Sequence, residues 1–222
     1  MIFFDRRKVN RLVRLAHLAS LAVAALLILV PCAEAEEAPF GLHWGESAEL
    51  ITGRNVTLTF EKENGGLRLF SAAKLRRLPE ETGVVRIVIS KDSGLQRIVW
   101  TSKDITDDKF GKKGIEEYLK FKSKLTDDFG RPRFSSEEIG IIRFTEADQF
   151  YECISLDGCG AYISKWRTDE GDVTMRLISN NQADRGQVEI TFDGPEWDAL
   201  VARRDKPAGE KPKAGPSGRE SR

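Results

Sequence analysis

The stretch Val84-Val85-Arg86-Ile87-Val88-Ile89, followed by the turn residues Asp92-Ser93-Gly94 and by the segment Leu95 to Thr101, determines the fold class of this chain. Its first part is nearly continuous apolar sequence, which is typical of an interior β-strand. The turn residues reverse the chain, so the third part is expected to return as a neighbouring strand. The stretch therefore predicts an antiparallel pair inside a sheet.

Side chains alternate between the two faces of a strand. In the segment Leu95 to Thr101, this alternation places Ile98 and Trp100 on one face and Leu95 and Val99 on the other. We therefore expect Ile98 and Trp100 to point the same way.

Upstream of this pair, the sequence predicts a short helix and two further strands. Ser47 can cap a helix that begins at Ala48 and runs to Ile51. From Val56 to Phe60 apolar residues alternate with threonines, which predicts a strand that is half buried on one face. The residues Asn64-Gly65-Gly66 predict a turn, and Leu67 to Phe70 continues the sheet.

Downstream of the pair, the clearest helix lies between Gly114 and the helix-ending residues Gly130 and Pro132. The face of this helix that lies opposite to its apolar side chains carries charges of both signs, which indicates a solvated surface. On this face Glu116 lies one turn before Lys120, so the two are expected to form an ion pair. The apolar residues recur at steps of three and four, as expected of an amphipathic helix: Ile115, Tyr118, Leu119, Phe121, Leu125 and Phe129.

The second half of the chain again contains predicted strands that are followed by a helix. A helix from Glu196 to Arg204 follows five predicted strands near Ile139–Phe144, Phe150–Leu156, Gly160–Trp166, Val173–Ile178 and Gln187–Phe192. The predicted fold class is α+β, with an antiparallel sheet of several strands and a central helix and a C-terminal helix packed on it. Because Val84–Ser90 and Val173–Ser179 look alike and lead to similar elements, a duplicated strands-then-helix unit is one possibility.

The two ends of the chain differ from this body. Residues 1–35 combine a basic leader, an apolar core and an Ala33-Glu34-Ala35 cleavage site, which is the pattern of a signal peptide. Residues 36–205 then form a single α+β domain, and residues 206–222 form a basic tail without large apolar side chains, which predicts disorder. The sequence leaves open whether the leader is cleaved or kept as an anchor.

Charge excludes one class of function. The whole chain is neutral, but the leader holds five basic and two acidic residues, so the chain without it carries a net charge of −3. Nucleic-acid-binding proteins present the opposite field. We therefore expect a periplasmic or secreted protein with no nucleic-acid partner, whose membrane contact is limited to the signal segment before cleavage.

Two cysteines remain after cleavage, and they are expected to pair in an oxidising compartment. A two-residue turn at Asp157-Gly158 would separate Cys153 from Cys159, so the disulfide requires Ile154 to Gly158 to form a wider loop. Such a loop acts either as a structural staple or as a rigid surface for a partner. The contact candidates for a partner are Tyr151, Leu156 and Tyr162.

No catalytic signature is present, and the catalytic residues are left unknown. His43 is the only histidine beyond the leader, so no multi-histidine metal site and no cofactor are expected. Carboxylate catalysis needs no motif, and four acids could pair across strands: Glu146, Asp148, Glu152 and Asp157. Four tryptophans raise the idea of a carbohydrate platform: Trp44, Trp100, Trp166 and Trp197.

The mature chain opens with Phe40-Gly41-Leu42-His43-Trp44-Gly45, an F-G-x-x-W-G pattern. This start resembles a loose group of small exported bacterial proteins, mostly uncharacterised, in which it precedes a short helix and a sheet. The segment Phe129-Gly130-Arg131-Pro132, followed by the strand that contains Trp166, is similar to that group as well. The resemblance implies an exported location and a fold, and it implies no activity.

These observations lead to three functional hypotheses. The first is a non-enzymatic exported protein that binds another component of the cell envelope, which could be a protein, a lipid or a glycan. The second is a hydrolase that acts on cell-wall material through two carboxylates. The third is a structural or stress-related envelope protein.

Overall fold

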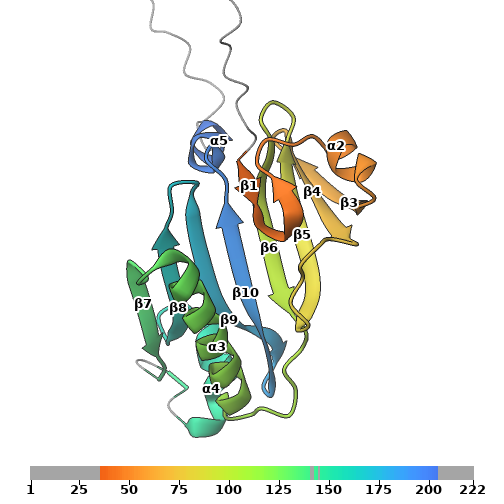
Figure 1. Ribbon diagram of the computed structural model, residues 1–222. Helices are drawn as coiled ribbons and strands as arrows, with labels where there is room; N and C mark the ends of the chain where they lie inside the picture. Colours follow the sequence, from red (N-terminus) through yellow and green to blue (C-terminus); the bar gives the residue numbers. More distant parts are fainter. Residues whose placement is uncertain (1–35, 141–142, 145, 205–222) are drawn as a thin grey trace, which may run out of the picture. The chain divides into compact units, whose positions relative to one another are not determined.

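The computed structural model describes residues 36–140, 143, 144 and 146–204. Its main feature is an eight-stranded antiparallel sheet, and with four α-helices it has the predicted α+β class (Figure 1). The strands are β3 Thr57–Asn64, β4 Leu67–Ala73, β5 Thr82–Ser90, β6 Gly94–Ser102, β7 Phe134–Glu138, β8 Ala161–Arg167, β9 Asp172–Gln182 and β10 Arg185–Asp193. The helices are α2 Ala48–Gly53, α3 Lys112–Phe129, α4 Phe150–Ser155 and α5 Trp197–Arg204.

Short elements complete the fold. The strands β1 Glu37–Ala38 and β2 Leu42–His43 form a two-stranded sheet around the 3-10 turn η1 Pro39–Gly41, and a second turn, η2 Ala147–Gln149, precedes α4. The Ser47 side chain accepts a hydrogen bond from the Leu50 amide, so the predicted cap of α2 is confirmed.

The strand order in the main sheet is β3-β4-β5-β6-β10-β9-β8-β7. The sheet therefore consists of two meanders, β3–β6 and β7–β10, each of which runs from an outer edge to the centre and is followed by a helix. The meanders join where β6 pairs antiparallel with β10. This is the arrangement that a duplicated strands-then-helix unit would produce, and a common origin of the two halves stays a prediction.

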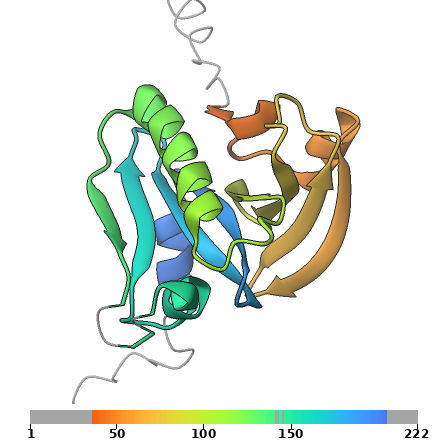
Figure 2. The ribbon, with the colours of Figure 1, turned by 90° about the horizontal axis from the view of Figure 1, so that it is seen from below.

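One face of the sheet carries the main core. Trp100 pairs with Val85 on one side and with Ile190 on the other, so these three buried residues point the same way. The N-terminal segment, which we define as residues 38–53, covers one half of this face, and the helices α3 and α4 cover the other half (Figure 2).

α3 covers the β8–β10 half through Tyr118, Phe121 and Leu125. The Phe121 ring lies 4.8 Å from that of Trp100, measured between centroids. In the N-terminal segment, Leu42, Trp44 and Ile51 are buried in the same cluster. Both covers therefore contribute to one continuous core.

α5 packs on the opposite face. Arg97 pairs with Val88 and Asp193, away from the core residues, and its guanidinium lies 3.7 Å from the ring centroid of Trp197. Trp197 and Leu200 are buried outside the main cluster. The C-terminal helix thus packs on the sheet as predicted, on the side away from α3.

The prediction that Leu95 faces away from Trp100 is wrong. A β-bulge shifts the register between Val88 and Ile89, so Leu95 pairs with Ile89 and Gln96 is left as the extra residue. Leu95 therefore turns into the core and is fully buried. The Gln96 side chain instead accepts a hydrogen bond from the Glu196 amide.

The predicted burial also differs at an edge strand and on α3. β3 lies at the edge of the sheet, where little covers it, and Phe60 is 55% exposed. On α3, Leu119 and Phe129 are exposed while Phe121 lies in the core. Lys120 forms an ion pair with Glu81 rather than the predicted pair with Glu116.

α3 begins at Lys112, earlier than the glycines suggested. Gly111 takes φ 70°, a left-handed conformation that suits glycine. The buried carboxylate of Asp108 accepts hydrogen bonds from the amides of Lys113 (3.0 Å) and Gly114 (2.8 Å). Asp108 therefore satisfies amides in the first turn of the helix.

Two strands predicted in the second half are corrected. Phe150–Leu156 is mostly α4, because burial of Phe150, Tyr151 and Cys153 in the tertiary structure overrides the strand-like composition. The strand predicted at Ile139–Phe144 is replaced by β7 at Phe134–Glu138, which ends before it. Residues 141, 142 and 145 lie outside the described part of the chain.

The predicted signal peptide at 1–35 and the predicted tail at 206–222 also lie outside the described residues. Within the part of the chain that the structure describes, no helix is long and apolar enough to cross a bilayer.

Candidate functional site

The two cysteines lie at disulfide distance. Their Cα atoms are 5.2 Å apart, and both side chains are buried. The predicted proximity of the two cysteines is confirmed, but Ile154 and Ser155, which were expected in a loop, belong to α4. Cys153 lies in α4 rather than in strand-like sequence, and a turn follows in which the Leu156 amide donates to the Cys153 carbonyl and the Cys159 amide donates to the Leu156 carbonyl.

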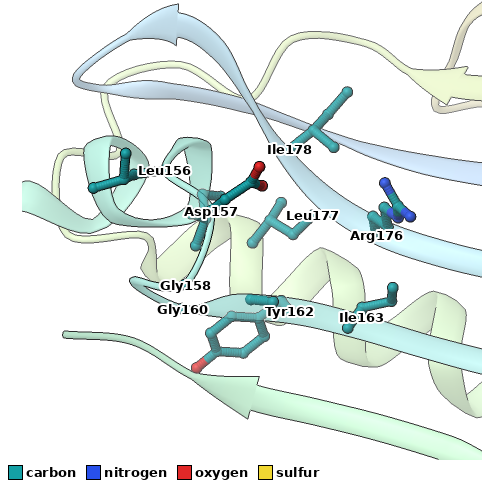
Figure 3. A pocket seen from close by; sticks show the side chains of 11 residues that line it. Leu156, Asp157, Gly158, Gly160, Tyr162, Ile163, Arg176, Leu177 and Ile178 are labelled. Atoms are coloured by element: carbon teal, nitrogen blue, oxygen red, sulfur yellow. The ribbon is translucent and has the colours of Figure 1, made fainter. Parts of the chain in front are cut away.

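A cavity of about 290 Å³ lies between this loop and the adjacent ends of β8 and β9. We call it the cysteine-loop pocket. Figure 3 shows Leu156 and Asp157 on the loop and the strands that carry Ile163 and Arg176 beside them. The pocket is lined by Leu156, Asp157, Tyr162, Ile163, Arg176 and Ile178, among others.

Two of the three predicted contact residues line this pocket. Leu156 is exposed at its wall, whereas Tyr162 borders the pocket but packs its ring against Tyr118 and Phe150 in the core. Tyr151 is placed differently, because its side chain is fully buried and its hydroxyl donates a 2.8 Å hydrogen bond to Asp108. Tyr151 thus links α4 to the start of α3 and is not a surface residue.

The pocket carries opposite charges. Asp157 and Arg176 are both exposed, and neither forms an ion pair with another of the described residues. The pocket therefore offers a carboxylate and a guanidinium between aliphatic walls.

The four predicted carboxylates do not pair across strands. Glu146 forms a capping box with Gln149 at η2, which leaves its carboxylate engaged by the backbone. Asp148 lies 2.7 Å from the Lys109 ammonium, which lowers the pKa of that carboxyl. Glu152 lies on α4 and Asp157 lies in the cysteine loop, so the correction follows from the helical structure of this segment.

A different set of carboxylates lines a cavity of about 350 Å³, together with Lys103: Glu80, Glu81 and Glu117. Burial raises the pKa of Glu117, and the neighbouring Glu81 raises it further. A hydrogen bond from Lys120 lowers the pKa of Glu81. Sequence reasoning missed this group because its members come from distant segments and no motif joins them.

The tryptophans form no exposed platform. Trp44, Trp100, Trp166 and Trp197 are all buried. The idea of carbohydrate stacking on these rings is therefore wrong.

The F-G-x-x-W-G segment is built into the fold. The Gly45 amide donates to the Leu95 carbonyl (3.0 Å), and the Leu95 amide donates to the Glu46 carbonyl (2.8 Å). The Glu46 carboxylate accepts a hydrogen bond from the His43 amide and pairs with Arg54. His43 therefore lies in a local network that fixes this segment.

Among the described residues, no group of three or more histidine, cysteine or acidic side chains could hold a metal ion. No family model, curated protein or solved structure matches the chain. The geometry of the pockets is therefore the basis for the functional proposals below.

Proposed function

We propose that this protein is an exported, non-enzymatic binding protein, and that its cysteine-loop pocket receives a protein segment of another envelope component. The observation that supports this most directly is the wall of the pocket. It is formed by residues 154–158, which the bond between Cys153 and Cys159 closes into a short loop. A loop that is already ordered loses less conformational entropy on binding than a free one.

The lining favours a protein segment over a glycan. Leu156, Ile163 and Ile178 offer aliphatic surface, while Asp157 and Arg176 offer charges that are free for a partner within the described structure. Sugar rings are commonly held by exposed aromatic faces, and the tryptophans are buried. An apolar side chain flanked by backbone and charged groups fits this mixture better.

Site-specific photocrosslinking tests this proposal. A photoreactive residue at Leu156, which is 37% exposed, is expected to crosslink an envelope protein in living cells. The matched control is Leu50 on α2, which is 62% exposed and far from the cysteine loop along the chain. Arg176→Glu is expected to reduce the crosslink, because it reverses a charge of the pocket.

Two results would contradict the proposal. One is crosslinking at Leu50 of the same partner with equal yield, which would indicate a nonspecific surface. The other is a crosslink at Leu156 that neither Arg176→Glu nor Asp157→Lys changes, because the partner would then make no use of the pocket.

The second candidate function is a hydrolase of cell-wall material, and the glutamates around Lys103 favour it. Opposite pKa shifts in neighbouring carboxyls are the usual pattern of an acid and a base in one site. Glu117, whose pKa is raised, would be the proton donor, and Glu81, whose pKa is lowered, would be the ionised base or nucleophile.

Incubation of the purified protein with wall fragments tests this alternative. Glu117→Gln is expected to reduce turnover by about 100-fold or more, whereas Glu116→Gln on the exposed part of α3 is expected to leave it unchanged. Failure of the unmodified protein to release any product would reject the hydrolase.

A further inference from the structure

A third cavity lies in the first meander, far along the chain from the cysteine loop. It has a volume of about 470 Å³ and is formed by the ends of β3, β4 and β5 with the loop that joins β4 to β5. We call it the β4–β5 pocket. Its size lies within the roughly 300–1,000 Å³ range of small-molecule sites.

Part of the wall of the β4–β5 pocket is aliphatic. Leu78 and Pro79 come from the loop, and Ala72 and Val84 come from the strands. The hydroxyl of Thr82 is already used, because it accepts a hydrogen bond from the Trp100 indole (2.8 Å) and donates one to the Pro79 carbonyl (2.6 Å). These bonds tie the loop to the core and give the cavity a fixed wall.

Among the described residues the lining contains no aromatic side chain, so a flat aromatic ligand would find no ring there to stack on. Two hydroxyls remain at the pocket, those of Thr59 and Ser71, which lie directly opposite each other in the β3–β4 register. The shape and chemistry therefore suit a hydrocarbon chain with a small polar end.

The charge of Lys74 favours a negatively charged group at the polar end of the ligand. This lysine is the only charged residue of the lining, it is exposed, and it forms no ion pair with the other described residues. Its backbone has φ 62°, a conformation that non-glycine residues rarely adopt. A lysine without an ion-pair partner among the described residues therefore lines the pocket, where it would complement an anion.

We propose that the β4–β5 pocket binds a free aliphatic monocarboxylic acid, with its hydrocarbon chain against Leu78 and Val84 and its carboxylate beside Lys74. This site is separate from the cysteine-loop pocket, and the proposal does not depend on the function assigned to that pocket. The same chemistry could also come from the acyl chain and headgroup of an anionic lipid, so the experiment includes both sources.

Octanoate is titrated into ¹⁵N-labelled protein while amide chemical shifts are followed by NMR. The expected shifts are at Ser71, Thr82 and Val84, which line the pocket. Each methylene added between hexanoate and decanoate is expected to tighten binding by about fourfold. Octylamine, which has the opposite charge, is expected to bind about fivefold more weakly.

Three substitutions test whether octanoate binds in this pocket and beside Lys74. Lys74→Gln is expected to weaken octanoate binding by about threefold to fivefold, whereas Lys112→Gln, an exposed lysine on α3, is expected to have no effect. Ala73→Phe is expected to fill the cavity and abolish binding, and the position is exposed, so the fold should tolerate it.

Several outcomes would overturn the proposal. They are octylamine binding as tightly as octanoate, affinity that does not depend on chain length, and amide shifts confined to residues outside the pocket. Binding to phosphatidylglycerol vesicles without any response to octanoate would also overturn it, because the ligand would then be a lipid surface.

Discussion

In the first meander, β3–β6, the core face is covered by the N-terminal segment, whereas in the second meander, β7–β10, it is covered by α3 and α4. The N-terminal segment consists of short elements, and besides its buried side chains it contacts the sheet through backbone hydrogen bonds, as at Gly45 and Leu95. α3 contacts the sheet through large side chains such as Phe121. The two halves should therefore respond to different kinds of substitution.

The largest effect is expected at Gly94, where the N-terminal segment meets the first meander. Gly94 has φ 66°, and an added Cβ would lie 2.0 Å from the Gly45 carbonyl oxygen. Gly94→Val should lower the free energy of unfolding by about 4 kcal/mol or more, measured by urea denaturation. Gly53→Ala is the control, because a Cβ at Gly53 meets nothing within 4 Å. A Gly94 variant as stable as the control would disprove the tight backbone contact.

A smaller but still large effect is expected at the helical cover. Phe121→Ala removes a buried ring that packs on Trp100, and it should cost about 3 kcal/mol. Leu119→Ala changes a side chain that is 46% exposed on the same helix, and it should cost less than about 1 kcal/mol. Equal costs for the two variants would contradict the orientation of α3.

The smallest effect is expected at Glu117, on the outer part of this helix, and it depends on pH. Burial raises the folded-state pKa of Glu117, so the folded protein holds this proton more tightly than the unfolded chain. The free energy of unfolding therefore falls as pH rises through the pKa that Glu117 has in the unfolded chain, about 4.3. This loss is complete above the raised pKa of Glu117 in the folded protein.

Glu117→Gln should therefore increase the melting temperature at pH 7 and leave it unchanged at pH 3. Glu116→Gln, at an exposed position, is the matched control. A Glu117 variant that is less stable than the unmodified protein at pH 7 would show that the carboxylate is stabilised by a partner instead.

An element could be predicted from the sequence where the residues that define it lie close together along the chain. The β5–β6 pair, β8, β9 and β10 were predicted because their apolar periodicity lies within a few residues. The cysteine loop was predicted for the same reason, since Cys153 and Cys159 are separated by only six positions.

The errors came from long-range interactions. The sequence of α4 predicts a strand, but in the structure this segment is a helix whose Tyr151 hydroxyl donates a hydrogen bond to the distant Asp108. Leu95 lies on the core face because of a β-bulge that depends on the register with the partner strand. The cavity around Glu117 and the β4–β5 pocket join residues from separate elements. No spacing in the sequence could indicate such cavities.

The position of α3 has a consequence for how the chain acquires its structure. This helix follows the first meander in sequence and contacts it at Trp100, but it packs mainly on the second meander, so most of its apolar face has no partner until the last strands are made. Contacts between such distant segments slow folding, and a partly synthesised chain exposes apolar surface. The fold is therefore completed only after β8, β9 and β10 have been synthesised.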